Sequence, residues 1–385
     1  MRNLSNVFSC FFLCCSLYTL GQDSLSIKDL QPYSYPFAIE NGELHGPGAE
    51  ILTKAVSNAH ITLLGTNNRS KLEAEFTNAL IVELDRSRYK TIVLEIGSGS
   101  ADILKRLSTP AEQTIANFKA LNRQYAFDRQ GQLFTPIPDF KSIEDAHFLQ
   151  NAASRDWSIL SIGTEYWTGY KMLVDELYTN LSIANKQAHQ QIYQETLLLL
   201  DKLYASINGQ SNAEVLQFTS ALKSSEVFQT FLNEMANYQN NHALVKAFRF
   251  SLEYWNMYGN QEFYKKNLLS AENNKVQLAQ TLKDKNFNFA KDKLFVRMWR
   301  NHLAKGTTIN GFYGLGNMLT GMAHFHGRKS LSIGTLQRFY EEDKLIKDIV
   351  ESKNFERVSY KELIPLGKKE EWILIDLRPF NKAFY

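Results

Sequence analysis

Residues 61–99 constrain the fold more than any other stretch of the chain, because they read as two buried strands joined by a helix. The sequence is ITLLGTNNRSKLEAEFTNALIVELDRSRYKTIVLEIGSG. Continuous apolar runs at 61–64 and 91–94 are typical of strands that are covered on both faces. The residues between them predict a turn followed by an amphipathic helix. A strand, helix and strand in this order form a βαβ unit, which requires a parallel sheet.

Polar side chains follow both predicted strands. Thr66, Asn68 and Arg69 come after the first strand, and Glu95 ends the second. In open parallel sheets, ligands bind beyond the carboxyl ends of the strands. We therefore expect a site at this edge, with Glu95 as a candidate catalytic carboxylate and the other three side chains as candidate substrate-binding groups.

The rest of the chain predicts an α/β protein, with a parallel-rich central sheet flanked by helices and a large all-helical insertion. A third strand at 157–163 is followed by Glu165, a second candidate catalytic carboxylate. Helical spacing without strand patterns predicts the insertion. Predicted elements after it are a helix at 291–303, a strand at 307–313, a helix around 332–339, and a closing strand at 372–376. The exit turn of the strand at 307–313 carries Asn317, a further candidate substrate-binding residue. The predicted divisions are 22–170 and 291–385 for the α/β core and 171–290 for the insertion.

The N-terminus predicts export. Arg2 precedes an apolar run at 7–20, which is followed by a small residue and a polar stretch. This order is typical of a signal peptide, here residues 1–21, and the run is too short to span a bilayer comfortably. All three cysteines, Cys10, Cys14 and Cys15, fall inside it. We expect a periplasmic or secreted protein without cysteine. The alternative is lipid anchoring at Cys10.

Composition argues against nucleic acid as a partner. The 43 basic and 40 acidic residues give a net charge of +3, scattered along the chain. The sequence suggests no transmembrane segment after signal removal. We expect a small-molecule ligand or substrate whose identity the sequence does not specify, and no metal or cofactor.

The order of these motifs resembles the erythromycin esterase-like family. The shared features are a signal peptide, a strand ending in Leu-Leu-Gly before a polar turn, a strand ending in Leu-Glu, and a late Gly-x-x-polar motif. The family belongs to a wider superfamily with the haem-uptake protein ChaN and the Tiki proteases. The resemblance covers residues 50–170 and 290–385, and it implies that Glu95 matches the family glutamate of the second strand.

The departures from the family pattern concern its acid and base residues. In the relatives, the first turn reads Leu-Gly-Glu followed by a histidine, and the late strand ends in Gly-x-x-His. Here Thr66 replaces the glutamate, Asn68 or Arg69 replaces the first histidine, and Asn317 replaces the second. Asparagine keeps hydrogen-bonding capacity but does not titrate. Loss of a general base removes on the order of 10²–10⁴ in rate.

The resemblance and its departures predict an exported protein with a degraded hydrolase site and a binding or accessory role. The alternative is an active metal-independent hydrolase of an ester or lactone, with Glu95 or Glu165 as base. A second alternative, implied by the superfamily alone, is haem or metal binding. It would draw an axial ligand from His324, His326 or the tyrosines, with the two histidines on one face of a strand.

Overall fold

The computed structural model describes residues 26–66, 71–138, 140, 142–209, 211–303, 305–306, 311–335, 338–341, 344–348 and 372–380. The predicted signal peptide with its cysteines lies outside these residues, as do Asn68 and Arg69. The chain divides into two compact units, of which the larger comprises Asn41–Glu43 and Thr53–Thr335. The smaller comprises Met1–Glu40, Leu44–Leu52 and Leu336–Tyr385. The predicted domain boundaries differ from this division and remain predictions.

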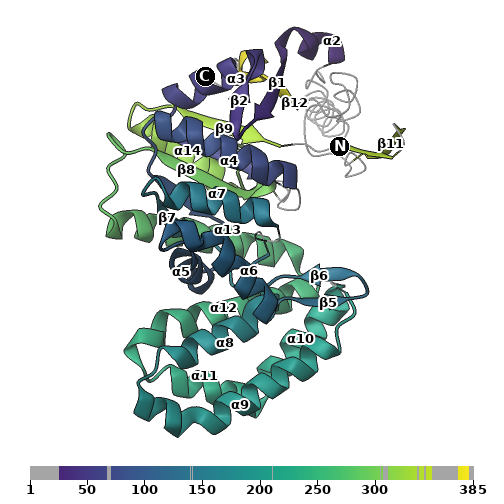
Figure 1. Cartoon of the computed structure of the whole chain (residues 1–385), viewed down its shortest axis with the longest axis vertical. Coiled ribbons are helices and arrows are strands. Elements are labelled where there is room, and N and C mark those ends of the chain that lie inside the picture. The colour runs from purple at the N-terminus through teal and green to yellow at the C-terminus, as the bar shows by residue number, and fades with distance from the viewer. Residues whose placement is uncertain are drawn as a thin grey trace, which may run out of the picture. The chain divides into compact units, whose positions relative to one another are not determined.

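A five-stranded parallel sheet forms the centre of the larger unit, which confirms the α/β class and the parallel sheet. The strands follow the spatial order β7-β4-β8-β3-β9. Their bounds are Ile61–Thr66 for β3, Thr91–Leu94 for β4, Ser158–Ser161 for β7, Leu294–Trp299 for β8 and Ser330–Gly334 for β9. Because β8 lies between β4 and β3, it separates the two strands of the first βαβ unit, although it comes much later in the chain. Figure 1 shows this later strand in green.

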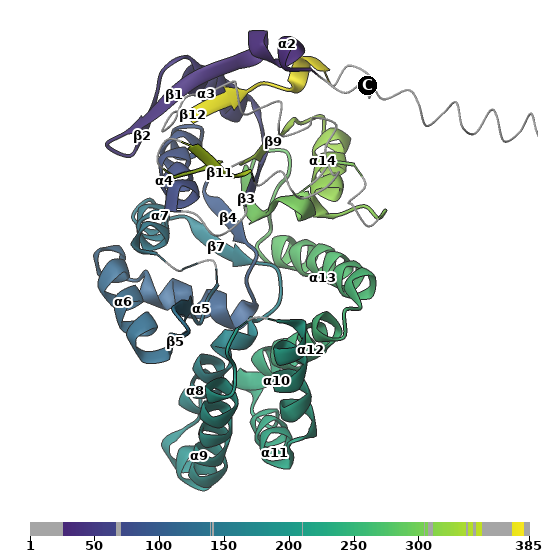
Figure 2. The same cartoon turned by 90° about the vertical axis from the view of Figure 1, so that its right-hand side faces the viewer.

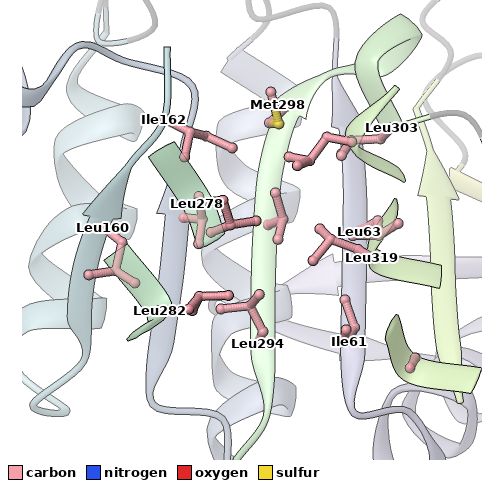
Figure 3. Close-up of a cluster of buried hydrophobic side chains, with 14 residues drawn as sticks. Ile61, Leu63, Leu160, Ile162, Leu278, Leu282, Leu294, Met298, Leu303 and Leu319 are labelled. Carbon is pink, nitrogen blue, oxygen red and sulfur yellow. The ribbon is translucent and has the colours of Figure 1, made fainter. Parts of the chain in front are cut away.

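The two faces of the sheet bury different side chains. Alternate residues of the strands point to one face, where they pack on α13 (Phe263–Asp284) and α14 (Leu315–Phe325). Figure 3 shows this cluster, with Leu278 and Leu282 of α13 placed against the strands. Helices α4 (Lys71–Arg86) and α7 (Ile143–Ala153) cover the opposite face (Figure 2). Burial on both faces explains the continuous apolar runs of the strands.

A helical region follows β7 in the chain. Among its described residues, the stretch from Tyr170 to Asp284 is free of strands, as the sequence predicts for the insertion. Besides α13, this region contains α8 (Tyr170–Thr179), α9 (Ile183–Ala205), α10 (Asn212–Ser224), α11 (Glu226–Met235) and α12 (His242–Gly259). Before it come α5 (Ser98–Leu107), α6 (Thr114–Tyr125) and the hairpin of β5 (Phe127–Arg129) and β6 (Gln132–Phe134). No described helix is both long and apolar enough to cross a membrane.

The smaller unit contains a three-stranded sheet in the order β12-β1-β2. Its strands are β1 (Ser34–Glu40), β2 (Glu43–His45, of which Leu44 and His45 belong to this unit) and β12 (Trp372–Ile375), and β12 pairs antiparallel with β1. The unit also holds α2 (Ile27–Leu30), the first residues of α3 (Pro47–Asn58), and the antiparallel pair β10 (Arg338–Glu341) and β11 (Lys344–Asp348). The predicted closing strand therefore exists, but it belongs to this sheet and not to the central one.

Two predicted helices near the C-terminus are wrong. Residues 291–303, predicted as a helix, contain β8 and the short 3-10 helix η5 (Arg300–Leu303). Leu294, Val296 and Met298 alternate toward one face with period two, and Arg297 between them points to the other, where its guanidinium lies over the Phe148 ring. The predicted helix at 332–339 contains parts of β9 and β10. Of the predicted strand at 307–313, residues 307–310 lie outside the described chain.

Candidate active site

The carboxylate of Glu95 connects the ends of two neighbouring strands. Glu95 follows β4, and His302 lies in η5 directly after β8. Glu95 Oε2 accepts a hydrogen bond from the Trp299 backbone N–H at 2.7 Å, and Oε1 contacts His302 Nδ1. Because β4 and β8 pair in parallel, both residues lie at the carboxyl edge of the sheet, where ligands bind in this class of fold.

The contact fixes the orientation of the imidazole. A carboxylate on Nδ1 holds the proton on that nitrogen and leaves Nε2 as the acceptor of the neutral ring. The Trp299 ring packs edge-on against the imidazole, with the centroids 5.5 Å apart. Side-chain exposure is 20% for His302 and 16% for Glu95, so the pair is partly shielded yet reachable from solvent. Such a pair can take a proton from a water molecule or a hydroxyl group.

Close backbone contacts at two glycines hold η5 in place. A Cβ on Gly65 of β3 would lie 2.8 Å from the Arg300 Cα, and one on Gly316 of α14 would lie 2.2 Å from the Leu303 carbonyl oxygen. Real Cβ atoms do not approach that closely. Glycine at both positions therefore lets β3 and α14 pack directly on the segment that carries His302.

Glu165 lies in the interior, at the N-terminus of α5. Its carboxylate accepts hydrogen bonds from the Gly99 backbone N–H at 2.6 Å and from the Ser100 hydroxyl at 2.6 Å. Burial raises the pKa of this carboxyl, and the hydrogen bonds from Ser100 and Gly99 oppose the rise. The N-terminus of a helix favours a carboxylate. Glu165 therefore satisfies the donors that begin α5, a role that strand-end reasoning does not reveal.

The predicted binding residues that the structure describes are Thr66 and Asn317. Thr66 ends β3 opposite Trp299 of β8 and is fully buried. Asn317 lies in the first turn of α14, where its Nδ2 donates to the Lys305 carbonyl at 2.7 Å. Glu95 and Asn317 thus bind the same chain segment, at His302 and at Lys305. Their predicted roles in binding a substrate remain predictions.

Helices α12 and α13 bring a further charged group near Glu95. Lys266 of α13 is buried, and its Nζ lies 5.0 Å and 5.1 Å from the ring centroids of Tyr254 and Tyr258 on α12. Burial lowers the pKa of the Lys266 amine to about 8, and the charge of Glu95 acts to raise it. The motifs of the sequence single out neither Lys266 nor His302. The available signal for Lys266 is a lysine on the buried face of an amphipathic helix.

A cavity of about 330 Å³ lies at the other edge of the sheet. It is lined by the amino ends of β4 and β7 and by the chain before β8, including Lys90, Ser158 and Lys293. Parallel strands place this edge opposite the Glu95–His302 pair. The cavity is therefore separate from the candidate active site.

The two histidines of the haem hypothesis are not on a strand. His324 lies in the last turn of α14 and His326 directly follows the helix, where its ring stacks on Phe289. In the part of the chain that the structure describes, no three or more His, Cys, Asp or Glu side chains are grouped to hold a metal ion.

Comparison with known proteins gives one likeness. No protein-family model and no curated protein matches this sequence. Among solved structures, the chain is similar to a mutant of the erythromycin esterase EreC in its open conformation, with 15% sequence identity and a TM-score of 0.37. The alignment covers 74% of this chain and 72% of the esterase chain.

Proposed function

We propose that this protein is a hydrolase in which His302, oriented by Glu95, removes a proton from the attacking water. The observation that carries the proposal is the contact of Glu95 Oε1 with His302 Nδ1 at the carboxyl edge of the sheet. A second carboxylate oxygen bound to the Trp299 amide holds the glutamate in one orientation. A histidine held by a carboxylate in this way is a positioned general base.

The reaction requires one water molecule and one carbonyl substrate. His302 Nε2 takes a proton while the water oxygen forms a bond to the carbonyl carbon. The tetrahedral intermediate then collapses, the carbon–oxygen bond to the leaving alcohol breaks, and the imidazolium returns the proton to the leaving oxygen. Glu95 stabilises the imidazolium and keeps its proton on Nδ1. Glu95 is therefore a positioning residue, and His302 is the catalytic residue.

The substrate class, an ester or lactone, follows from the sequence resemblance to the erythromycin esterase-like family. The hypothesis of a degraded site depends on three family positions that lack a glutamate or histidine. His302 supplies an imidazole from a position that the sequence analysis assigns to a helix, and this supports the alternative of an active enzyme. Export by the predicted signal peptide places this activity outside the cytoplasm.

Hydrolysis of a panel of aryl esters and lactones tests the proposal. We expect the wild type to turn over at least one member, and His302→Asn and Glu95→Gln each to lose on the order of 10²–10⁴ in kcat/KM. His147→Asn, an exposed histidine on α7, and Glu75→Gln, an exposed glutamate on α4, are the matched controls and should keep wild-type rates. The pH profile of kcat/KM should lose its acid limb in His302→Asn.

Two results would contradict the hydrolase. One is the absence of turnover across the panel by a folded wild type, which would favour the binding or accessory role. The other is turnover that both His302→Asn and Glu95→Gln retain at wild-type rates. A metal chelator added to the wild type reports separately whether a metal ion takes part.

A further inference from the structure

The buried face of α13 changes character along the helix. Its buried residues recur every four positions, and they are Lys266, Ser270, Asn274, Leu278 and Leu282. The last two are apolar and pack against the sheet, and Figure 3 shows Leu282 beside Leu294 and Leu278 farther along the strands. Gln277 Oε1 accepts from the Gly163 backbone N–H just beyond the end of β7. The residues before Gln277 therefore lie past the carboxyl edge of the sheet, and there the buried face is polar.

A polar stripe on a buried helix face has a cost unless each group finds a partner. Lys266 is only 7% exposed. Its Nζ lies over the two tyrosine rings, and none of the described residues forms a hydrogen bond or an ion pair with it. Asn274 is 2% exposed, and its Oδ1 likewise lacks a hydrogen bond within the described chain. Asn274 Oδ1 is therefore a buried acceptor without a partner among the described residues, and the Lys266 ammonium lies on the same helix face over two aromatic rings. Two such groups on one face indicate that polar atoms from another molecule bind there.

The charges around Lys266 select an anionic oxygen as its partner. Tyr254 and Tyr258 of α12 present ring faces to the ammonium, and Glu95 acts on it from the end of β4. On α13 itself, Glu262 is paired with the neighbouring Lys265. Ring faces attract a cation but leave its N–H donors unused. A carboxylate or oxyanion would use those donors and form a charge-assisted hydrogen bond.

We propose that Lys266, whose Nζ lies over the rings of Tyr254 and Tyr258, is the anion-binding residue of this site and binds a negatively charged oxygen of the bound molecule. This inference rests on the proposed function for the location of the reacting carbonyl, but anion binding itself does not require hydrolysis. Asn274 Oδ1, two helical turns along the same face, accepts from a hydroxyl or amide of the same molecule. The anionic oxygen belongs either to a carboxylate of the substrate or to the oxyanion of the tetrahedral intermediate.

Binding of benzoate, with benzamide as its neutral counterpart, tests the inference. Trp255 contacts both tyrosines, with ring centroids 5.0 Å and 5.5 Å from theirs. A fluorescence change on binding that Trp255→Phe removes therefore reports binding there. We expect the wild type to bind benzoate at least about tenfold more tightly than benzamide, since a charge-assisted hydrogen bond is stronger than a neutral one. Lys266→Met should abolish this preference, and Lys266→Arg should keep it.

The matched control is Lys265→Met, which removes the adjacent lysine, whose side chain is 71% exposed. It should keep the wild-type preference for benzoate. In the wild type the preference should weaken as the pH rises through about 8, the pKa of the Lys266 amine, and Lys266→Arg should keep it at pH 9. The inference is overturned if the wild type binds both compounds equally, or if folded Lys266→Met retains the preference.

Two esters separate the sources of the anionic oxygen. Acetylsalicylate carries a carboxylate, and phenyl acetate does not. If Lys266→Met slows hydrolysis of acetylsalicylate alone, the residue binds the substrate carboxylate; if it lowers kcat for both, it binds the oxyanion. His302→Asn should still prefer benzoate, so binding is measured even where hydrolysis is absent. A failed hydrolase assay with intact benzoate preference would reject the proposed function and leave the anion site standing.

Discussion

Glu95 contacts His302 across 207 positions of sequence, because β4 and β8 are neighbouring parallel strands that both end at the same edge of the sheet. The same carboxylate also accepts the Trp299 amide, which ends β8. One glutamate thereby orients the first turn after the neighbouring strand. The pairing of these two strands is what brings His302 into contact with the Glu95 carboxylate.

Glu95 and His302 should act as a unit in a double-mutant cycle. Because Glu95 works only through the imidazole, we expect Glu95→Gln combined with His302→Asn to lose about as much kcat/KM as His302→Asn alone, on the order of 10²–10⁴. The measurement is kcat/KM of the two single variants and the double variant on one aryl ester. Multiplicative losses would mean that Glu95 acts on the substrate independently of His302.

Glu165 should be replaceable by glutamine without loss of activity. Its carboxyl is fully buried and binds the donors at the start of α5. We expect Glu165→Gln to keep wild-type kcat/KM, and Glu165→Ala to lose about 3 kcal/mol of unfolding free energy because it leaves these donors unpaired. Urea unfolding and the ester assay measure the two effects. Loss of turnover in a stable Glu165→Gln would restore the catalytic role predicted from the sequence.

The stability of Glu165→Gln relative to the wild type should depend on pH. Burial raises the pKa of the folded carboxyl above its ordinary value of 4.5, so the folded protein keeps this proton to higher pH than the unfolded chain. The wild type therefore loses unfolding free energy relative to the glutamine variant as the pH rises from 4.5 through the raised pKa. Urea unfolding of both proteins at pH 5 and pH 8 measures the change. An equal difference in unfolding free energy between the two proteins at pH 5 and at pH 8 would contradict the raised pKa.

Substitution by alanine should change the unfolding free energy in opposite directions at Gly316 and Gly321 of α14. A Cβ at Gly316 would lie 2.2 Å from the Leu303 carbonyl oxygen, whereas one at Gly321 meets no atom within 4 Å. We expect Gly316→Ala to lose about 2–3 kcal/mol in unfolding free energy and to slow turnover by displacing His302. Gly321→Ala, the control in the same helix, should gain about 0.5–1 kcal/mol. Equal stability of the two variants would show that η5 does not depend on this contact.

The gain in unfolding free energy that Lys266→Met gives over the wild type should be greatest below about pH 8. Burial lowers the pKa of the folded amine from 10.5 to about 8. Between these values the unfolded chain binds a proton that the folded chain has released, so wild-type stability rises with pH in that window. The advantage of Lys266→Met should shrink by at most about 3 kcal/mol from pH 8 to pH 10.5. Thermal or urea unfolding across this range measures it, and a constant difference would contradict the lowered pKa.

Short-range patterns were sufficient for the first half of the sheet. The strands at β3, β4 and β7 are continuous apolar runs bounded by turns, and such runs have few other structures open to them. β8 is different, because the charged Arg297, buried on the face opposite α13 and α14, interrupts its apolar run. The sequence therefore predicts a helix at 291–303, and this prediction conceals His302 at the end of a strand.

The sequence by itself determined that the chain forms a parallel α/β sheet with a large helical region, and it predicts a site at the carboxyl edge near Glu95. These properties follow from local periodicity and from the rule that parallel strands end together. Only the tertiary structure decided which side chains meet there. The pairing of β4 with β8, the direct approach of Gly65 and Gly316 to η5, and the crossing of α13 past the sheet edge join residues far apart in the chain. Long-range contacts of this kind leave no local pattern, so His302 and Lys266 become visible only in the folded chain.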